Sequence, residues 1–462
     1  MNTEFAIKLI DIALNKGADR AEVYVKTSKS LGIEVKEQKI DTLESSMTMG
    51  YCIRVIKDNR LGFSYSTDPN EMNIVAEKAI EASKYSEPDE YLELPTPPPP
   101  PLTKGGTEGG ASLERGGNGG VKIFDNDIAA LPEGDAINLA LLIENSAFKE
   151  DKRIKKIRKA SGSFSANNTY IANSNGINVH YQSTGCSAQL MAIAEEGSES
   201  QLGWDYEGSR FLKDISFEQV GRNAARRAVQ LLGARKINSV KGFVLLDNSV
   251  SAEFLGILSS ALSAESVQKK KSMLAGKKGT MVSSNRLNII DSGLLDKKLG
   301  SKPVDDEGVP TTHKILIEKG ILKGYLYNTY TARKDGVVST GNAVRGGFTG
   351  IPTVGPTNLY MEPASTEYTS SFEKLIKNID KGLYVIETMG MHTANPISGE
   401  FSVGASGLWI ERGEIKHPVK EAVISGNILE LFKDAVMVGD DLRFYGNIGA
   451  PSLLIEEIDI SG

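Results

Sequence analysis

Residues 247–276, DNSVSAEFLGILSSALSAESVQKKKSMLAG, predict a long helix near the centre of this 462-residue chain. Asp247, Asn248 and Ser249 supply side chains that can cap its first turn. Its apolar residues recur at intervals of three and four, which places them on one helical face. These residues are Val250, Phe254, Ile257, Leu258, Ala261 and Leu262. We therefore expect a buried helix with which a C-terminal domain begins.

The same helix lacks the side chains of a hydrolytic metal centre. It contains no histidine, cysteine or aspartate beyond its cap, and its only acidic residues are Glu253 and Glu265. A catalytic zinc ion requires about three protein ligands and one open position. The pattern alone therefore favours a scaffold helix.

Before the central helix, amphipathic helices alternate with β-type segments. Helical periodicity covers residues 4–16, 71–83, 134–149 and 217–232. Alternating apolar and polar residues predict strands at 21–27, 31–40, 49–58, 61–66, 158–167, 170–173, 177–183 and 187–195. Asn175-Gly176 predicts a type I′ hairpin turn. Arg222, Arg226 and Arg227 are expected on a solvated helix face. This order predicts an α+β domain with a curved antiparallel sheet.

After the central helix, strands dominate the pattern. They are predicted at 312–318, 320–326, 383–389, 405–412, 414–424 and 452–460, with one short helix at 430–438. The predicted fold class is therefore α+β. It comprises an N-terminal sheet-and-helix domain and a C-terminal antiparallel β domain beginning with the long central helix.

Composition suggests where the domains divide. Residues 1–94 and 122–238 are expected to form the N-terminal domain, and residues 239–462 the C-terminal domain. Residues 95–121 form a Pro/Gly-rich low-complexity insertion, with five consecutive prolines at 97–101 followed by glycine pairs. Such a segment favours polyproline II and has little apolar surface to bury. We expect it to be a disordered surface loop, and we assign it no function.

Charge and cysteine content exclude several classes of protein. The net charge of -6 provides no basic field for nucleic acid or an anionic membrane surface. Cys52 and Cys186 lack motif spacing and are expected to be reduced core thiols. No apolar run reaches about 18 residues, so no membrane span is expected. The N-terminus lacks the features of a signal peptide, and the cytoplasm is the expected location.

One glycine-rich segment, ETMGMHTANPISGEFSVGASG at 387–407, holds candidate substrate-binding residues. His392 and Asn395 are its candidate polar contacts, and Gly404 and Gly407 would let the backbone approach a ligand or another chain closely. The alternative is that His392 is a structural, hydrogen-bonded residue of an irregular loop. No catalytic residue is assigned.

A second candidate lies in GNAVRGG at 341–347, where Arg345 could bind a carboxylate such as a peptide C-terminus. An ordinary loop arginine is the alternative. The four histidines, His180, His313, His392 and His417, include no pair within ten residues of each other. The sequence therefore contains no local metal-binding motif.

Four long regions together resemble the TldD/PmbA family, also called modulators of DNA gyrase. The resemblance covers nearly the whole chain except roughly residues 95–121. Its strongest segments lie at 244–284, 324–346, 387–415 and 423–442, with PSLLIEEIDISG at 451–462.

The resemblance implies where a zinc site would lie. TldD-type chains carry a His-Glu-x-x-x-His helix and a cysteine near the C-terminus that together bind zinc, whereas PmbA chains, also called TldE, lack these ligands. Alignment through SMLAGKKG places the metal-binding stretch at about 255–260, which reads LGILSS here. Residues 443–452, RFYGNIGAPS, contain no cysteine. The chain thus resembles the PmbA/TldE branch, with no metal of its own.

The resemblance also implies a function. It suggests the PmbA/TldE-like subunit of a dimeric cytoplasmic metallopeptidase that acts on unfolded or short peptides, with zinc bound in a TldD-type partner. One alternative is a homodimeric peptide-binding or scaffold protein without an enzymatic partner. The other is a hydrolase with an unrecognised site near His392.

Overall fold

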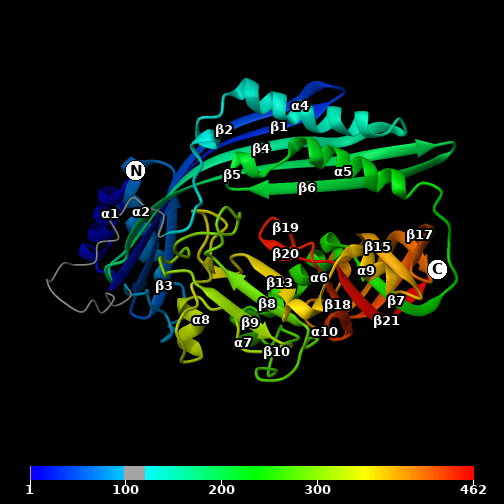
Figure 1. The fold of residues 1–462 in the computed structure, drawn as a ribbon. Coiled ribbons are helices and arrows are strands. Elements are labelled where there is room, and N and C mark those ends of the chain that lie inside the picture. Colours follow the sequence, from blue (N-terminus) through cyan, green and yellow to red (C-terminus); the bar gives the residue numbers. More distant parts are fainter. Residues whose placement is uncertain (1, 98–119) are drawn as a thin grey trace, which may run out of the picture.

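The computed structural model describes residues 2–97 and 120–462 (Figure 1). Most of the predicted Pro/Gly-rich insertion, residues 98–119, lies outside these described residues. Below, the N-terminal domain means the described residues up to 238, and the C-terminal domain means residues 239–462. Within the described residues, no helix is long and apolar enough to cross a membrane.

The N-terminal domain contains one six-stranded antiparallel sheet in the order β3-β2-β1-β4-β5-β6. The strands are β1 Arg20–Lys36, β2 Lys39–Lys57, β3 Arg60–Ser66, β4 Ile154–Asn173, β5 Asn178–Glu196 and β6 Glu199–Ser209. The predicted antiparallel sheet is therefore confirmed. The predicted short strands merge, because 158–167 and 170–173 lie in continuous β4, and 177–183 and 187–195 lie in continuous β5.

The predicted turn type between β4 and β5 is wrong. A type I′ turn requires positive φ at both central residues, but of Asn175 and Gly176 only Gly176 has one, +97°. The Asn173 side-chain oxygen instead accepts hydrogen bonds from the backbone N–H groups of Asn175 and Ile177, both at 3.0 Å. This side chain stabilises a longer turn.

The helices of this domain cover one face of the sheet. They are α1 Thr3–Asn15, α2 Met72–Ser83, α3 Asn126–Ala129, α4 Glu133–Glu150 and α5 Phe217–Gln230. Side chains alternate between the two faces of a strand. Val23 and Val25 accordingly pack in the core with α1 and α2, while Tyr24 contacts Val304 of the C-terminal domain on the opposite face. In Figure 1, α4 lies above the long strands and the C-terminal domain lies below them.

The C-terminal domain contains two larger sheets around one core. The sheet orders are β14-β18-β21-β17-β16-β15-β7 and β10-β9-β8-β13-β20-β19. The strands of the first are β7 Val240–Leu246, β14 Thr369–Ser370, β15 Lys381–Met389, β16 Glu400–Glu411, β17 Glu414–Asn427, β18 Ala435–Gly439 and β21 Leu453–Ser461. The strands of the second are β8 Leu287–Ser292, β9 His313–Glu318, β10 Ile321–Leu322, β13 Leu359–Pro363, β19 Arg443–Tyr445 and β20 Ile448–Ala450. A small ribbon joins β11 Ala343–Val344 to β12 Thr353–Val354.

The pairing in this domain is mostly antiparallel, as predicted, but three pairs of strands are parallel. The pairs β7–β15, β13–β20 and β14–β18 are parallel. Parallel neighbours require crossover connections rather than short hairpins. The predicted helix at 430–438 is also shorter, since α10 covers Ile428–Lys433 and β18 follows it. The remaining helices are α8 Thr329–Lys334 and α9 Phe372–Lys377.

The central helix is shorter than predicted. Helix α6 covers Asn248–Ala261, and a separate short helix, α7, covers Ala264–Gln268. The break occurs where the backbone N–H of Ala264 donates to the Leu326 carbonyl at 2.9 Å instead of continuing the helix. The domain begins with strand β7, not with the helix. The predicted apolar face is buried except for the partly buried Ile257.

Candidate functional site

Helix α6 and the β19–β20 hairpin lie side by side. The Tyr445 hydroxyl donates to Asn248 Oδ1 at 2.7 Å, and Asn248 Nδ2 donates to Asp441 Oδ2 at 3.2 Å. The family resemblance implies that TldD-type chains carry their zinc ligands on the helix that corresponds to α6 and on a cysteine near the corresponding hairpin. The fold therefore brings together the two segments where that site would lie.

The residues at this position do not fit a zinc ion. Leu255 is fully buried in the core, Gly256 has no side chain, and the Ser260 hydroxyl donates to the carbonyl of Ile257 at 2.9 Å. Within residues 2–97 and 120–462, no group of three or more His, Cys, Asp or Glu side chains could hold a metal ion. Since zinc binds imidazole, thiolate and carboxylate groups, we assign no chemistry to a metal on α6.

Two acidic residues lie on α6 and on the neighbouring strand β15. Glu253 of α6 accepts a hydrogen bond from the Thr388 hydroxyl at 2.5 Å, and Glu387 precedes that threonine on β15. Burial raises the pKa of Glu387 to about 7, with Arg227 opposing this shift and Glu253 adding to it. Burial raises the pKa of Glu253 as well. The pair can hold a proton near neutral pH.

Arg227 is not part of a solvated face, so that prediction is wrong for this residue. Its side chain is 14% exposed and forms an ion pair with Asp247, at the start of α6 in the other domain. The Tyr384 hydroxyl also donates to Asp247, at 2.7 Å. Arg222 and Arg226 are more exposed and face Glu150 on α4. The helical period places all three arginines near one another, but only Arg227 reaches the domain boundary.

A closed ionic cluster joins the two domains on the face of the N-terminal sheet that is opposite its helices. Arg54 on β2 donates to Glu22 on β1 at 2.7 Å and to Glu307 of the C-terminal domain at 2.9 Å. Arg345, between β11 and β12, forms an ion pair with the other oxygen of Glu22. The side chains of Glu22, Glu307 and Arg345 are 0% exposed. Two acids and two arginines thus balance each other in a buried interface.

Arg345 has further contacts that hold it in place. It donates to the backbone carbonyl of Gly350 at 3.0 Å and to that of Asp306 at 3.2 Å, and it stacks over the ring of Tyr24. Arg345 therefore binds a carboxylate, as the sequence suggests it could, but the carboxylate is an internal one, Glu22. Its side chain is not free to bind a peptide terminus.

A cleft of about 460 Å³ lies beside this cluster, between the N-terminal sheet and the C-terminal domain. The sheet contributes one wall through β1, β4 and β5. Loops of the C-terminal domain and the β19–β20 turn contribute the other. The lining residues are Tyr24, Lys26, Asn167, Thr169, Tyr181, Ser183, Arg210, Leu299, Gly300, Lys302, Asp306, Val344, Arg345, Pro356, Thr357, Gly446 and Asn447.

The cleft is strongly basic. Four of its lining residues are cationic and one, Asp306, is acidic. Lys302 is paired with Asp306 at 3.1 Å, and Arg345 with Glu22. Neither Lys26 nor Arg210 forms an ion pair with any acid in the described part of the chain. We define these two residues as the open cationic wall.

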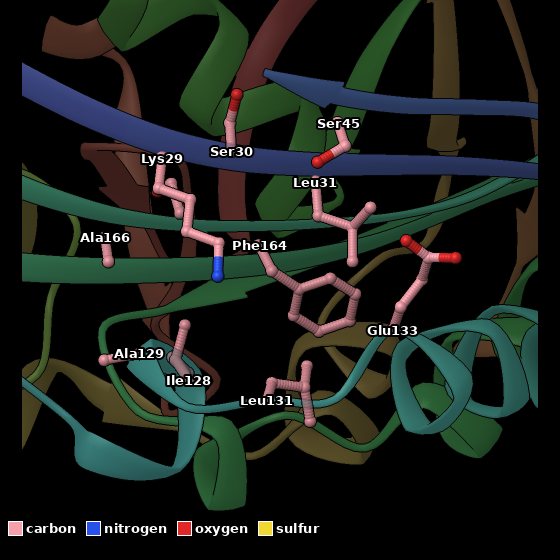
Figure 2. Close-up of a pocket in the computed structure, with 11 residues that line it drawn as sticks. Lys29, Ser30, Leu31, Ser45, Ile128, Ala129, Leu131, Glu133, Phe164 and Ala166 are labelled. Carbon is pink, nitrogen blue, oxygen red and sulfur yellow. The ribbon is translucent and has the colours of Figure 1, made fainter. Parts of the chain in front are cut away.

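A smaller cavity of about 130 Å³ lies within the N-terminal domain, between the sheet and the segment linking α3 to α4. Figure 2 shows the Phe164 ring of β4 beside Leu131, with Glu133 and Lys29 at its polar edge. Phe164 and Ile128 belong to the buried core of this domain. This cavity is a packing hollow with no cluster of charged groups, so the basic cleft is the stronger candidate site.

The candidate residues of the 387–407 segment do not line the cleft. His392 is exposed, on a short 3-10 turn after β15, and within the described residues its ring forms no hydrogen bond. Asn395 has a local structural role: its side-chain oxygen accepts hydrogen bonds from the backbone N–H groups of Ile397 at 2.8 Å and Ser398 at 3.2 Å.

Gly404 and Gly407 lie inside strand β16 rather than in a loop. A Cβ atom at Gly407 would lie 1.8 Å from the carbonyl oxygen of Tyr384 on β15, whereas one at Gly404 would lie 3.4 Å from the Met389 side chain. Gly407 is therefore required for close strand pairing at the bulge between β15 and β16. Neither glycine adjoins the basic cleft.

No local motif marks the residues that do line the cleft. Strand alternation over 21–27 predicts that Tyr24 and Lys26 share a face. Only the tertiary structure brings them to Arg210, which follows β6, and to Asn447 in the β19–β20 turn.

Both cysteines are buried free thiols, as predicted. Burial raises the pKa of Cys52 to about 11 and that of Cys186 to about 12. Neither thiol is therefore a ready nucleophile at neutral pH.

Comparison with known proteins covers most of the chain. The family models for PmbA/TldA metallopeptidase domain 1, central domain and C-terminal domain match residues 21–83, 126–232 and 240–462. A metalloprotease PmbA homolog from Buchnera aphidicola is 32% identical over 455 residues, which cover 96% of this chain and 93% of that protein.

Solved structures agree with the sequence comparison. A proposed modulator of a DNA gyrase from Thermotoga maritima matches with a TM-score of 0.87 and 31% identity, covering 99% of both chains. TldE from Thermococcus kodakarensis shares the fold, with a TM-score of 0.86 at 24% identity over 99% of this chain and 100% of that chain. The chain therefore belongs to the PmbA/TldD metallopeptidase family.

Proposed function

We propose that this chain is the PmbA/TldE-type subunit of a two-chain metallopeptidase that acts on unfolded or short peptides. In this assembly a TldD-type partner binds the catalytic zinc, and this chain helps to enclose and align the peptide. The observation that carries the proposal is the LGILSS stretch on α6 beside a cysteine-free β19–β20 hairpin. The chemistry of these residues offers no zinc ligand, although the likeness to a metalloprotease PmbA homolog extends over nearly the whole chain.

The basic cleft supports the second part of this proposal. Its lining includes loops of the C-terminal domain, tyrosine and asparagine side chains, and the two cations of the open cationic wall. Ligand sites characteristically combine a concave shape with a few well-placed polar groups. Such a cleft can hold an extended peptide without breaking a bond in it.

Peptidase activity of the purified chain, of a TldD-type chain and of their mixture tests the proposal. We expect no cleavage of an unfolded polypeptide by this chain alone, with or without added zinc. We expect chelator-sensitive cleavage by the mixture. Robust cleavage by this chain alone that chelators do not inhibit would overturn the proposal.

A second candidate function is a homodimeric peptide-binding protein without an enzymatic partner. It is favoured by the cleft, whose two walls come from a single chain. Size measurement of the chain alone and mixed with a TldD-type chain distinguishes the two. A stable dimer of this chain that does not exchange with the TldD-type chain would favour the second candidate.

A further inference from the structure

Arg210 lines the cleft and has no carboxylate partner among residues 2–97 and 120–462. Its Nη1 donates to the Thr184 carbonyl at 2.9 Å, and its Nη2 donates to the carbonyls of Ser301, at 3.2 Å, and Leu299. Its Nε is buried and forms no hydrogen bond. These partners are neutral, so they orient the guanidinium but do not balance its charge. Burial lowers the pKa of Arg210 to about 10, which leaves it charged at neutral pH.

Lys26 supplies a second unbalanced charge in the same cleft. It is half-buried on β1, between Gly50 of β2 and Thr169 of β4. No acid of the described residues lies within ion-pair distance of it. An ammonium group has three donors and no acceptor, so a half-buried lysine needs an external acceptor, either water or a ligand.

Neutral donors lie beside these two cations. Tyr181 and Ser183 line the same cleft, as does Asn447, whose Nδ2 already donates to the Thr357 carbonyl at 2.9 Å. Burial raises the pKa of Tyr181 to about 12, so its phenol retains its proton and can donate at neutral pH. Among the described residues that line the cleft, the one acid is Asp306, which is already bound to Lys302 and to the backbone N–H of Arg345 at 2.7 Å. The charge of Asp306 is therefore offset within the cleft wall.

The cations of the cleft thus fall into two kinds. Lys302 and Arg345 are balanced internally, while Lys26 and Arg210 are not. Taking a charge out of water without a partner is costly, and a bound oxyanion would provide that partner.

We propose that the open cationic wall binds the C-terminal carboxylate of a short peptide through Lys26 and Arg210. The choice of a peptide as the source of the carboxylate rests on the proposed function. The oxyanion site itself rests only on the cleft and its two unbalanced cations.

Calorimetric titration of the full chain, without a partner, tests this proposal. The probes are N-acetyl-trialanine with a free carboxylate, the same peptide as its C-terminal amide, and inorganic phosphate. We expect the free acid to bind at least about tenfold more tightly than the amide, because the charge-assisted contacts are lost in the amide. Binding of the free acid should also weaken as salt is raised.

Substitutions distinguish binding at Lys26 and Arg210 from a nonspecific effect of the positive charge of the protein. Lys26→Gln should weaken binding of the free acid at least about tenfold, whereas Lys26→Arg should keep most of it. Lys155→Gln is the matched control, because Lys155 is an exposed β4 lysine that does not line the cleft. Arg210→Gln can disturb folding, because Arg210 also donates to three backbone carbonyls. Its binding is therefore compared only if circular dichroism shows the native fold. If it does not, the result for Lys26→Gln tests the proposal.

Equal binding of the acid and the amide, unchanged binding by Lys26→Gln, or no binding at all would overturn the proposal. Phosphate binding without binding of the free acid would overturn the peptide assignment. Because the partner is absent, this result does not depend on whether the two-chain assembly has peptidase activity.

Discussion

The closed ionic cluster and the open cationic wall lie only four residues apart on β1, at Glu22 and Lys26. Both face the C-terminal domain from the same side of the sheet. In the cluster, two acids and two arginines balance each other. In the wall, Lys26 and Arg210 have no acidic partner among the described residues. The difference indicates that one region joins the domains and the other is available to a ligand.

Breaking the closed cluster should produce the largest effect on stability. Glu22→Gln leaves Arg54 paired with Glu307 and leaves the buried Arg345 without its carboxylate partner. Removal of one partner from a buried ion pair costs about 3–5 kcal/mol. We expect a loss of this size in the free energy of unfolding, measured by urea denaturation. Glu44→Gln, at an exposed position of β2, is the control. A loss below about 1 kcal/mol would mean that the cluster does not join the domains.

The close pairing of β15 with β16 should also make the protein sensitive to substitution at this site. Gly407→Ala places a Cβ against the carbonyl of Tyr384, so we expect a loss of up to about 3 kcal/mol in thermal or urea unfolding. Gly404→Ala is the matched substitution, with only an ordinary contact to Met389, and should be nearly neutral. Equal effects of the two substitutions would contradict the role assigned to Gly407.

Glu387 is a buried carboxylate whose charge Arg227 only partly offsets, so it makes the stability of the protein depend on pH. Its pKa is raised to about 7, so between about pH 4.5 and 7 the folded state holds a proton that the unfolded chain has released. Stability should therefore fall as pH rises through this range. Glu387→Gln should flatten this slope and stabilise the protein at pH 8 by on the order of 2 kcal/mol. Melting temperatures from pH 5 to 8 measure the effect; an unchanged slope would contradict the assignment.

The open wall should produce the smallest effect on stability. Lys26→Gln removes no ion pair and leaves Arg54 and Arg345 with their partners. We expect a change within about 0.5 kcal/mol in urea denaturation. If the loss instead approached that of Glu22→Gln, Lys26 would be a structural residue and the contrast between the two regions would disappear.

Local periodicity predicts the elements of this chain better than it predicts their neighbours. The helices expected at 4–16, 134–149 and 217–232 lie within two residues of α1, α4 and α5. Their apolar spacing is a local property, and so it can be read from the sequence. The parallel pairing of β7 with β15 joins residues well over a hundred positions apart, and no local signal predicts it.

The candidate site was less predictable for the same reason. The glycine-rich composition of residues 387–407 suggests a binding loop. In the structure, Gly407 instead permits close strand pairing, and the Asn395 side chain stabilises a turn. Arg345 shows the chemistry expected of it, with Glu22 as the internal partner. Lys26 and Arg210 become a site only when distant strands and loops meet at the domain boundary.

Zinc stoichiometry is the most direct test of the central claim that this chain contributes no catalytic metal. Elemental analysis should be made on the purified chain, on a TldD-type chain and on their purified complex. We expect no stoichiometric zinc in this chain alone and one zinc per complex, bound by the partner. One tightly bound zinc per copy of this chain alone, retained through dialysis, would contradict it.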